Sequence, residues 1–186
     1  MALDEIMVHL NPYRPSWPLE FEEFKKKILD CAIHLIERVD HIGSTSVPGL
    51  VAKDIIDIQI GVRDFTNISA LKVALNTIGF EMAENFKQDH VPGREFGEFA
   101  QGWEKRFFKS VGTRPVHIHV RQVGEKNYEF ALGFRDYLRN CPEAAHIYGQ
   151  FKQRLAEAIQ DNLKTYTLVK DPVCDLIYML AKSHKS

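Results

Sequence analysis

Apolar residues recur every three or four positions in two parts of the first half of the chain. Over residues 17–35 this spacing predicts an amphipathic helix, capped by Ser16 and accepting Pro18 in its first turn. A second helix of the same type is expected at about 64–78, because a glycine, Gly79, follows its last apolar position. Both helices therefore have one apolar side to place against a sheet.

Strict alternation of apolar and polar residues marks the strand that such helices would cover. In residues 55–62 (IIDIQIGV) three isoleucines and a valine share one face, whereas Asp57 and Gln59 share the other. A shorter strand is expected at 39–43, just before a Gly-Ser turn. The pattern therefore predicts a sheet with one packed face and one face that presents polar groups.

Two further strands are expected at 103–110 and 115–122, after a polar, glycine-containing segment (83–102) that is typical of a long loop or lid. In the second of these strands the valines and isoleucine face the core. His117 and His119 therefore share the open face.

The last third of the chain has the composition and spacing of helices. One helix is predicted at about 126–140 and another begins with Pro142 as its first residue. A third is predicted to be capped by Asp171, with Pro172 as its first helical residue.

These elements predict an α+β fold: a small mixed sheet flanked by helices, with a C-terminal helical extension. We expect one domain over residues 1–186, with the sheet core at about 1–122 and the helical tail at about 126–184.

Composition narrows the classes of function. The formal net charge of the 186 residues is −1, so no general basic field is available to hold duplex nucleic acid. No apolar run approaches the roughly 20 residues of a membrane-spanning helix. The N-terminus is acidic and rich in proline, unlike a signal peptide, and the three cysteines form no C-x-x-C pair. We therefore expect a cytoplasmic protein with reduced thiols.

Residues 41–57 hold the densest group of candidate functional residues. A turn of small and hydroxyl-bearing residues can present backbone N–H groups and hydroxyls to an anion such as phosphate. On the following strand Asp57 could hold Mg²⁺ against that phosphate. The alternative is an ordinary β-turn followed by a solvated aspartate. The candidate phosphate-binding residues of this segment are His41, Gly43, Ser44, Thr45 and Ser46.

The segment HIGSTSVPGL-x-AK-x-IIDI, preceded by PY-x-PSWP and followed by FRDYLR and YT-x-x-K, resembles the GrpB family of uncharacterised proteins. The resemblance extends from Pro12 to about Lys182. It implies a fold like that of the nucleotidyltransferase superfamily, in which a Gly-Ser turn precedes a strand with an acid-x-acid pair. A domain of this type is fused to dephospho-CoA kinase in some bacteria.

Two positions depart from the patterns that the resemblance implies. The second acid of the superfamily pair is Gln59 here, and Asp54 follows Lys53 where GrpB members usually carry proline. Two-metal catalysis clamps the attacking and leaving oxygens with ions held by two or three carboxylates, and an amide is a weaker ligand for such ions. Asp54 is not an obvious replacement, because it lies three residues before Asp57 and so on the opposite face of the sheet.

His117 and His119 offer a different metal site. Two imidazoles at i and i+2 on one strand lie about 7 Å apart on one face, which suits chelation of one transition metal. Together with Asp57 they would favour Zn²⁺ or Mn²⁺ over Mg²⁺. The alternative is a pair of solvated surface histidines.

Basic residues of the helical tail complete the candidate site. Arg135 and Arg139 lie at i and i+4 on one predicted helix and could grip a phosphate, although a structural ion pair explains them equally well. Lys152 and Lys170, which the GrpB resemblance retains, could supply phosphate-binding cations, and solvated surface lysines are the alternative.

The sequence thus suggests a metal-dependent nucleotidyl or phosphoryl transferase that acts on a nucleotide-type small molecule. Its candidate catalytic residues are Asp57, Lys53 and Arg135, and its expected cofactor is a divalent ion, Mg²⁺ or Mn²⁺ with Zn²⁺ as an alternative. Two other functions stay open: a non-catalytic module that binds a nucleotide or a CoA-like ligand, and a hydrolase that uses Asp57 with the histidine pair.

Overall fold

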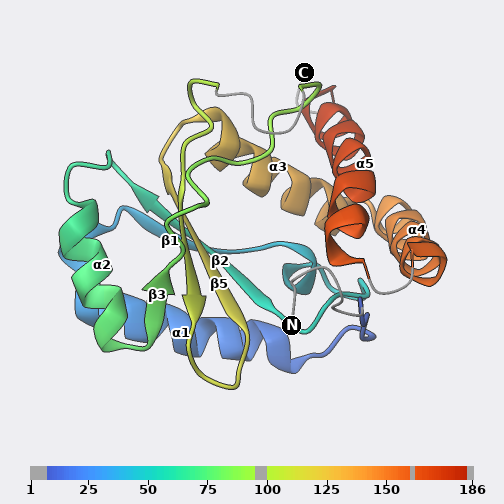
Figure 1. Ribbon diagram of the computed structural model, residues 1–186. Helices are drawn as coiled ribbons and strands as arrows, with labels where there is room; N and C mark the ends of the chain where they lie inside the picture. Colours follow the sequence, from blue (N-terminus) through green and yellow to red (C-terminus); the bar gives the residue numbers. More distant parts are fainter. Residues whose placement is uncertain (1–7, 95–99, 160–161, 184–186) are drawn as a thin grey trace.

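The computed structural model describes residues 8–94, 100–159 and 162–183 and contains a five-stranded mixed sheet (Figure 1). The strand order is β1-β2-β5-β4-β3, in which only β2 and β5 are parallel. The strands are β1 (Arg38–Ile42), β2 (Ile56–Val62), β3 (Phe80–Met82), β4 (Arg106–Ser110) and β5 (Val116–Gln122).

Helices lie on both sides of this sheet. In Figure 1, α1 and α2 lie on one side and α3, α4 and α5 gather on the other. The helices are α1 (Ser16–Ala32), α2 (Ile68–Thr77), α3 (Lys126–Asn140), α4 (Pro142–Ile159) and α5 (Leu163–Ser183), with short 3₁₀ turns at Ile33–Leu35 and Ser44–Ser46. The predicted class, a mixed sheet flanked by helices with a helical C-terminal part, is confirmed.

The face toward α1 and α2 is apolar, as the alternation in β2 predicted. Residues that pair across β2 and β5 on this face include Ile58 with Ile118 and Ile60 with Val120, and all four are fully buried. Burial of apolar surface in one contiguous cluster is the main favourable contribution to folding. The cluster includes Trp17, Phe21 and Ile28 from α1, Leu71 and Leu75 from α2, and Phe108 from β4.

The opposite face carries the polar residues of the same strands. Pairing of β2 with β5 sets Asp57 beside His117 and Gln59 beside His119. Helix α3 covers the Gln59 end of this face, where the Gln59 amide donates to the carbonyl of Tyr128. Gln59 is therefore fully buried, whereas the Asp57 end opens into a cavity.

Three predicted helix starts are wrong, and strand β4 begins at Arg106 and not at 103. Pro15 is the N-cap of α1, and the Ser16 hydroxyl donates to Glu20 inside the helix instead of capping it. Helix α2 begins only at Ile68, because the Asp64 carboxylate accepts the Thr66 amide N–H in a turn before it.

The third wrong boundary concerns the last helix, which does not begin at Asp171 and Pro172. Helix α5 passes through Pro172, although proline removes one helical hydrogen bond. Its buried side chains lie on both sides of the proline: Tyr166 precedes it, and Cys174 and Ile177 follow it. A continuous buried stripe therefore outweighs the local break.

The structure also bears on the membrane and on the thiols. No helix in the described ranges is long and apolar enough to cross a membrane. All three cysteines are free thiols, with Cys174 buried and Cys31 and Cys141 partly buried.

Candidate functional site

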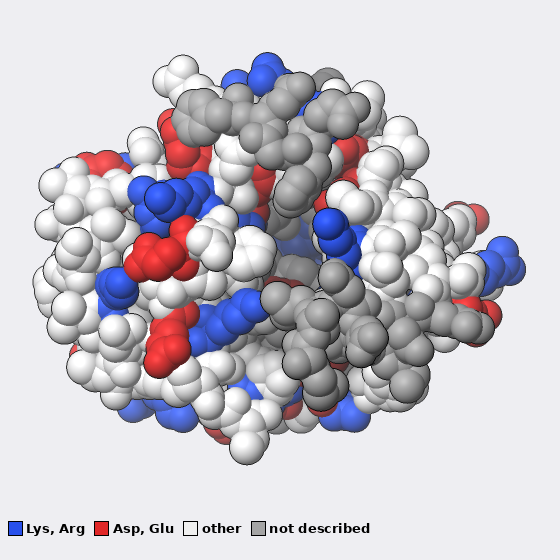
Figure 2. Space-filling view, viewed as in Figure 1, with Lys and Arg blue, Asp and Glu red and all other residues white. Residues whose placement is uncertain are grey.

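A cavity of about 340 Å³ lies between the polar face of the sheet and helices α3, α4 and α5. It appears as the hollow near the middle of the surface in Figure 2, with basic side chains beside it. Asp57, Lys53, Ser44, Lys152 and Lys170 all line it. The structure thus brings together predicted residues from a turn, a strand and two helices.

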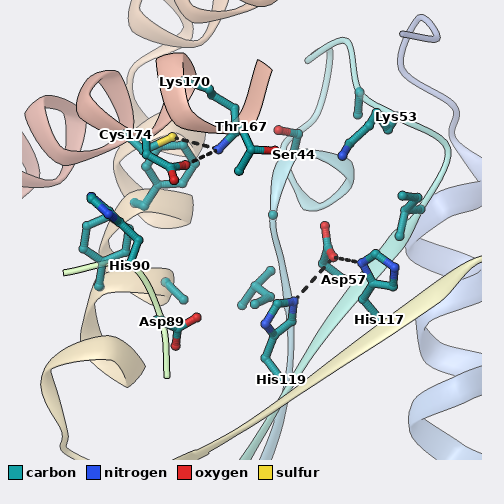
Figure 3. Close-up of a pocket in the computed structure, with 18 of the residues that line it drawn as sticks. Ser44, Lys53, Asp57, Asp89, His90, His117, His119, Thr167, Lys170 and Cys174 are labelled. Carbon is teal, nitrogen blue, oxygen red and sulfur yellow. Dashed lines mark hydrogen bonds and ion pairs between the residues drawn. The ribbon is translucent and has the colours of Figure 1, made fainter. Parts of the chain in front are cut away.

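Asp57 lies on the floor of the cavity between the two predicted histidines (Figure 3). Its Oδ1 atom is 3.5 Å from His117 Nδ1 and 3.7 Å from His119 Nε2. Burial alone would raise the pKa of this carboxyl group, but the hydrogen bonds from the two imidazoles lower the pKa well below its usual range. Asp57 is therefore ionised at any physiological pH.

The contact between His119 and Arg121 shows which ring nitrogen of His119 carries the proton. Arg121 Nη2 lies 3.4 Å from His119 Nδ1, and because a guanidinium group only donates, Nδ1 must accept. The proton then resides on Nε2, which faces Asp57. Burial, with Arg121 and Lys105 nearby, lowers the pKa of His119 to about 4 despite the attraction of Asp57. His119 is thus a neutral donor near pH 7.

This arrangement does not fit the predicted metal set of Asp57, His117 and His119. A metal ion needs the Nε2 lone pair of His119, which would move the proton to Nδ1 and point it at the Arg121 guanidinium. Consistently, no group of three or more His, Cys, Asp or Glu residues in the described segments is arranged to hold a metal ion. The divalent cofactor stays a prediction.

Lys152, on α4, is buried at the cavity wall, with 2% of its surface exposed. Its ammonium group donates to Ser44 Oγ at 2.9 Å and to the carbonyl of Val51. Burial and the charges of Lys170 and Lys53 lower its pKa to about 7, although Cys174 opposes the change. Lys152 is thus a buried amine without a carboxylate ion pair, and its pKa lies far below the usual lysine range.

Lys53 and Lys170 differ in how their charges are balanced. The side-chain amine of Lys53 makes no hydrogen bond or ion pair with another described residue, and burial lowers its pKa although Asp57 raises it. Lys170 pairs with Asp171 at 3.1 Å and donates to Cys174 Sγ, and these partners raise its pKa against the effect of burial. Lys53 and Lys152 are therefore the cations that an anion could neutralise.

The predicted phosphate turn is only partly directed at the cavity. The Ser46 hydroxyl donates to the Gly43 carbonyl at 2.6 Å, and the Thr45 hydroxyl donates to the Ile55 carbonyl at 3.2 Å. His41 pairs with Ile58 and so lies on the apolar face, stacked on Phe21, with its Nε2 atom 3.1 Å from Thr45 Oγ1. His41 therefore braces the turn and does not line the cavity, and Ser44 presents the available hydroxyl.

Gly43 holds the turn against Asp57. Its φ of 69° and ψ of −174° belong to a region that only glycine adopts readily. A Cβ atom at this position would lie 2.5 Å from Asp57 Oδ2. Glycine is thus required both by the backbone and by the approach of the carboxylate.

At Gln59, where the resemblance to the nucleotidyltransferase superfamily implied a second acid, this chain has a closed polar network. Arg121 donates to Gln59 Oε1 at 2.5 Å and to both carboxylate oxygens of Asp89, which also pairs with Lys105 at 2.7 Å. Burial would raise the pKa of Asp89, but Arg121 and Lys105 lower it well below its usual range. Asp89 is therefore a neutralised acid and not a free replacement for the missing one.

The predicted arginine pair supports the framework and lies outside the cavity lining. Arg135 donates to the His41 carbonyl at 3.0 Å and to Asp136 at 2.7 Å, and Arg139 donates to the Ser46 carbonyl at 2.9 Å. Asp54 lies away from Asp57, as predicted, and pairs with Arg14 and Arg114. The geometry gives Arg135 no contact with the reacting region, and its catalytic role stays a prediction.

Sequence reasoning missed two residues of the segment 83–102 that reach the site. Asp89 anchors the network described above, and His90 Nε2 lies 2.9 Å from the Asp175 carboxylate of α5, so the segment is tied across the cavity wall. Adjacent acidic and imidazole groups in an otherwise polar loop were the available signal. The expectation of a loop or lid did not assign them a role.

Comparison of the sequence with known proteins identifies a family and several relatives. The family model described as GrpB protein matches residues 7–179. A protein of Mycobacterium tuberculosis described as dephospho-CoA kinase is 33% identical over 175 residues, which are 88% of this chain and 43% of that protein. The chain thus spans less than half the length of such relatives. A UPF0157 protein of Streptomyces coelicolor is 32% identical over 170 residues, covering 91% of this chain and 82% of that protein.

The fold comparison agrees with the sequence comparison. The crystal structure of the conserved protein GrpB from Enterococcus faecalis matches with a TM-score of 0.78 and 30% identity, covering 96% of this chain and 100% of that one. The turn, the strand with Asp57, and the residues Lys152 and Lys170 all fall inside the matched residues 7–179. The chain therefore belongs to the GrpB family.

Proposed function

We propose that the cavity binds the phosphate groups of a nucleotide-type small molecule and serves phosphoryl or nucleotidyl transfer. One observation carries this proposal: Lys152, which is buried, and Lys53, which is partly buried, make no ion pair with a described carboxylate and line one cavity together with the ionised Asp57. Burying uncompensated ammonium groups is costly unless an anion restores the charge balance. A phosphate group would do so while leaving Asp57 to contact the acceptor.

The residues divide the work of such a transfer. Lys53 and Lys152 would offset the charge of the phosphate oxygens, and Ser44 would add a hydroxyl. Asp57, held ionised by two imidazole donors, would accept a hydrogen bond from an attacking hydroxyl and so orient it. The relatives described as dephospho-CoA kinase carry a nucleotide-type substrate in their name, and this agrees with the ligand class.

A second candidate function is a binding module without transfer chemistry. The network of Gln59, Arg121 and Asp89 favours it, because it occupies the region where a second metal-binding acid would be needed. Both functions require the same phosphate site and differ only in turnover.

The test is a thermal-shift and calorimetry screen with inorganic pyrophosphate and nucleoside mono-, di- and triphosphates. A ligand at 100 times its Kd raises the free energy of unfolding by about 2.7 kcal/mol, which is readily detected. We expect Lys53→Met to weaken binding at least about tenfold, since a buried charged contact contributes about 1.5–3 kcal/mol. Lys109→Met, which removes an exposed lysine from the same sheet face outside the cavity lining, is the matched control and should leave Kd unchanged.

Two outcomes separate the alternatives. Absence of binding by every phosphate compound, or equal Kd values for Lys53→Met and the wild type, would overturn the phosphate site. If a nucleotide binds, ³¹P NMR of the mixture with candidate hydroxyl acceptors decides between transferase and binding module, because a transferase forms a new phosphate ester on the acceptor and a binding module leaves the nucleotide unchanged.

A further inference from the structure

We propose that Ser44 and Lys152 form a nucleophile and general-base pair, in which Ser44 Oγ attacks a phosphorus centre of the bound ligand. The inference rests on the proposed function, because it takes the cavity as the site of a phosphate-bearing ligand. It goes further by assigning a covalent step to a residue that otherwise only binds phosphate.

The contact between the two side chains has the geometry that such a pair requires. Lys152 Nζ lies 2.9 Å from Ser44 Oγ, although the two residues are 108 positions apart in the sequence. Ser44 is partly exposed and lines the cavity, whereas Lys152 is buried behind it. A nucleophile at the surface of a cavity with its base on the protected side is the arrangement of a serine activated by a neighbouring base.

The surroundings of Lys152 favour a neutral amine. The groups that face it are the ammonium groups of Lys53 and Lys170, the thiol of Cys174 and the ring of Tyr148, 4.8 Å from the amine. The two lysines and burial lower its pKa to about 7, and Cys174 opposes them. Lys152 is therefore far easier to deprotonate at neutral pH than an ordinary lysine, and the neutral amine is the form that can accept a proton.

The other hydroxyls of the same turn are engaged elsewhere. Ser46 Oγ donates to the Gly43 carbonyl, and Thr45 Oγ1 donates to the Ile55 carbonyl and lies beside His41. Among the turn hydroxyls in the described structure, Ser44 alone contacts a side-chain amine. The assignment is therefore specific to one position in a run of three similar residues.

The step balances without any further reactant. The Ser44 Oγ–H proton passes to the Lys152 amine as the oxygen forms a bond to phosphorus, and the bond from phosphorus to the leaving oxygen breaks. The leaving oxygen takes that proton from Lys152, which becomes neutral again. An acceptor hydroxyl or water then attacks the phosphorus and gives its proton to Lys152, and Lys152 passes the proton to Ser44 Oγ as the bond between phosphorus and Ser44 breaks, so that the serine ester is an intermediate.

The experiment measures the nucleophilicity of Ser44 with diisopropyl fluorophosphate, followed by peptide mass spectrometry. We expect Ser44 to be labelled at a rate that rises as pH increases through about 7. Ser69, exposed on α2, is the reference serine and should react at least about tenfold more slowly. Lys152→Met should slow Ser44 labelling at least tenfold, and Lys152→Arg, which keeps the charge but cannot act as a base, should slow it equally.

Melting temperatures and circular dichroism establish that both variants are folded, and if Lys152→Met does not fold, Lys152→Arg alone carries the comparison. Labelling of Ser44 no faster than that of Ser69, or at the wild-type rate in either folded variant, overturns the pair. Neither result affects pyrophosphate binding, which calorimetry on Lys53→Met tests separately. Failure of the pair and failure of the phosphate site are thus distinguishable.

Discussion

On the α1–α2 face of the sheet, the central residues of β2 and β5, such as Ile58 and Ile118, are apolar and completely buried. On the other face the next residues of the same two strands are Asp57 and His117, which border a cavity. One strand pair therefore supplies stability on one side and ionisable groups on the other. The free-energy cost of burying the ionisable groups is offset by the packing of the apolar residues that alternate with them along the same strands.

The two ends of the cavity face differ in how their polar and charged groups are paired. Under α3, Arg121 donates hydrogen bonds to both Gln59 and Asp89, so the polar groups there are paired. At the open end, neither Lys53 nor Lys152 makes an ion pair with a described carboxylate, although the charge of Asp57 raises the pKa of Lys53. Buried polar groups are normally paired, so unbalanced charge confined to one end of one face marks the place for a ligand.

The largest expected effect comes from neighbouring phenylalanines on β4 that point to opposite faces. Phe108→Ala, in the apolar cluster, should lower the free energy of unfolding by about 3–5 kcal/mol, the usual cost of a large core cavity. Phe107→Ala should cost less than half as much, because Phe107 packs on the histidine rings and on Phe86, which is half exposed and can rearrange. Urea denaturation of both variants measures the difference. Equal losses would show that the cavity face is packed as tightly as the core.

A second effect depends on pH and tests the apolar face through its buried histidine. Burial, with Arg139 and Arg135, lowers the pKa of His41 to about 4 although Asp57 opposes the change. The unfolded chain takes up this proton near pH 6.5 and the folded chain only near 4, so the contribution of neutral His41 to stability is complete above 6.5 and is lost as the pH drops between these values. The loss is about 3 kcal/mol at roughly 1.4 kcal/mol for each pKa unit.

The variant His41→Phe retains the stacking on Phe21 and removes the titrating group. Between pH 6.5 and 4 its free energy of unfolding should decline less than that of the wild type by about that amount. Asp57 and Asp89, whose pKa values are lowered in the fold, contribute acid sensitivity only below pH 4 and so outside this window. Parallel curves for the two proteins between pH 6.5 and 4 would contradict the assignment to His41.

Sequence periodicity predicted the apolar face almost completely, because alternation in β2 and helical spacing in α1 are local patterns. The bounds of α3 at 126–140 agree with the structure for the same reason. Local signals failed where tertiary packing overrode them: α5 continues through Pro172 because its buried stripe continues.

The cavity face was predictable only in part. Turn and strand motifs located Ser44 and Asp57, and spacing on β5 placed His117 and His119 on the same face. Asp89 and Arg121 could not be paired from sequence, since their contact spans 32 positions and depends on the path of a loop. The same limit applies to Lys152, whose role depends on a turn more than 100 residues away.

The smallest expected effect separates backbone strain from site geometry at two glycines that flank the turn. Gly43 and Gly49 both have positive φ angles, 69° and 77°. A Cβ on Gly49 meets nothing within 4 Å, whereas one on Gly43 would lie 2.5 Å from Asp57 Oδ2. Gly49→Ala should therefore cost about 1 kcal/mol of backbone strain, and Gly43→Ala about 2 kcal/mol because the carboxylate must also move.

NMR of the imidazole nitrogens supplies the sharper measurement, since displacement of Asp57 should shift the signals of His117 and His119 in Gly43→Ala alone. Unchanged imidazole signals in that variant would mean that Asp57 is not held in place by the turn.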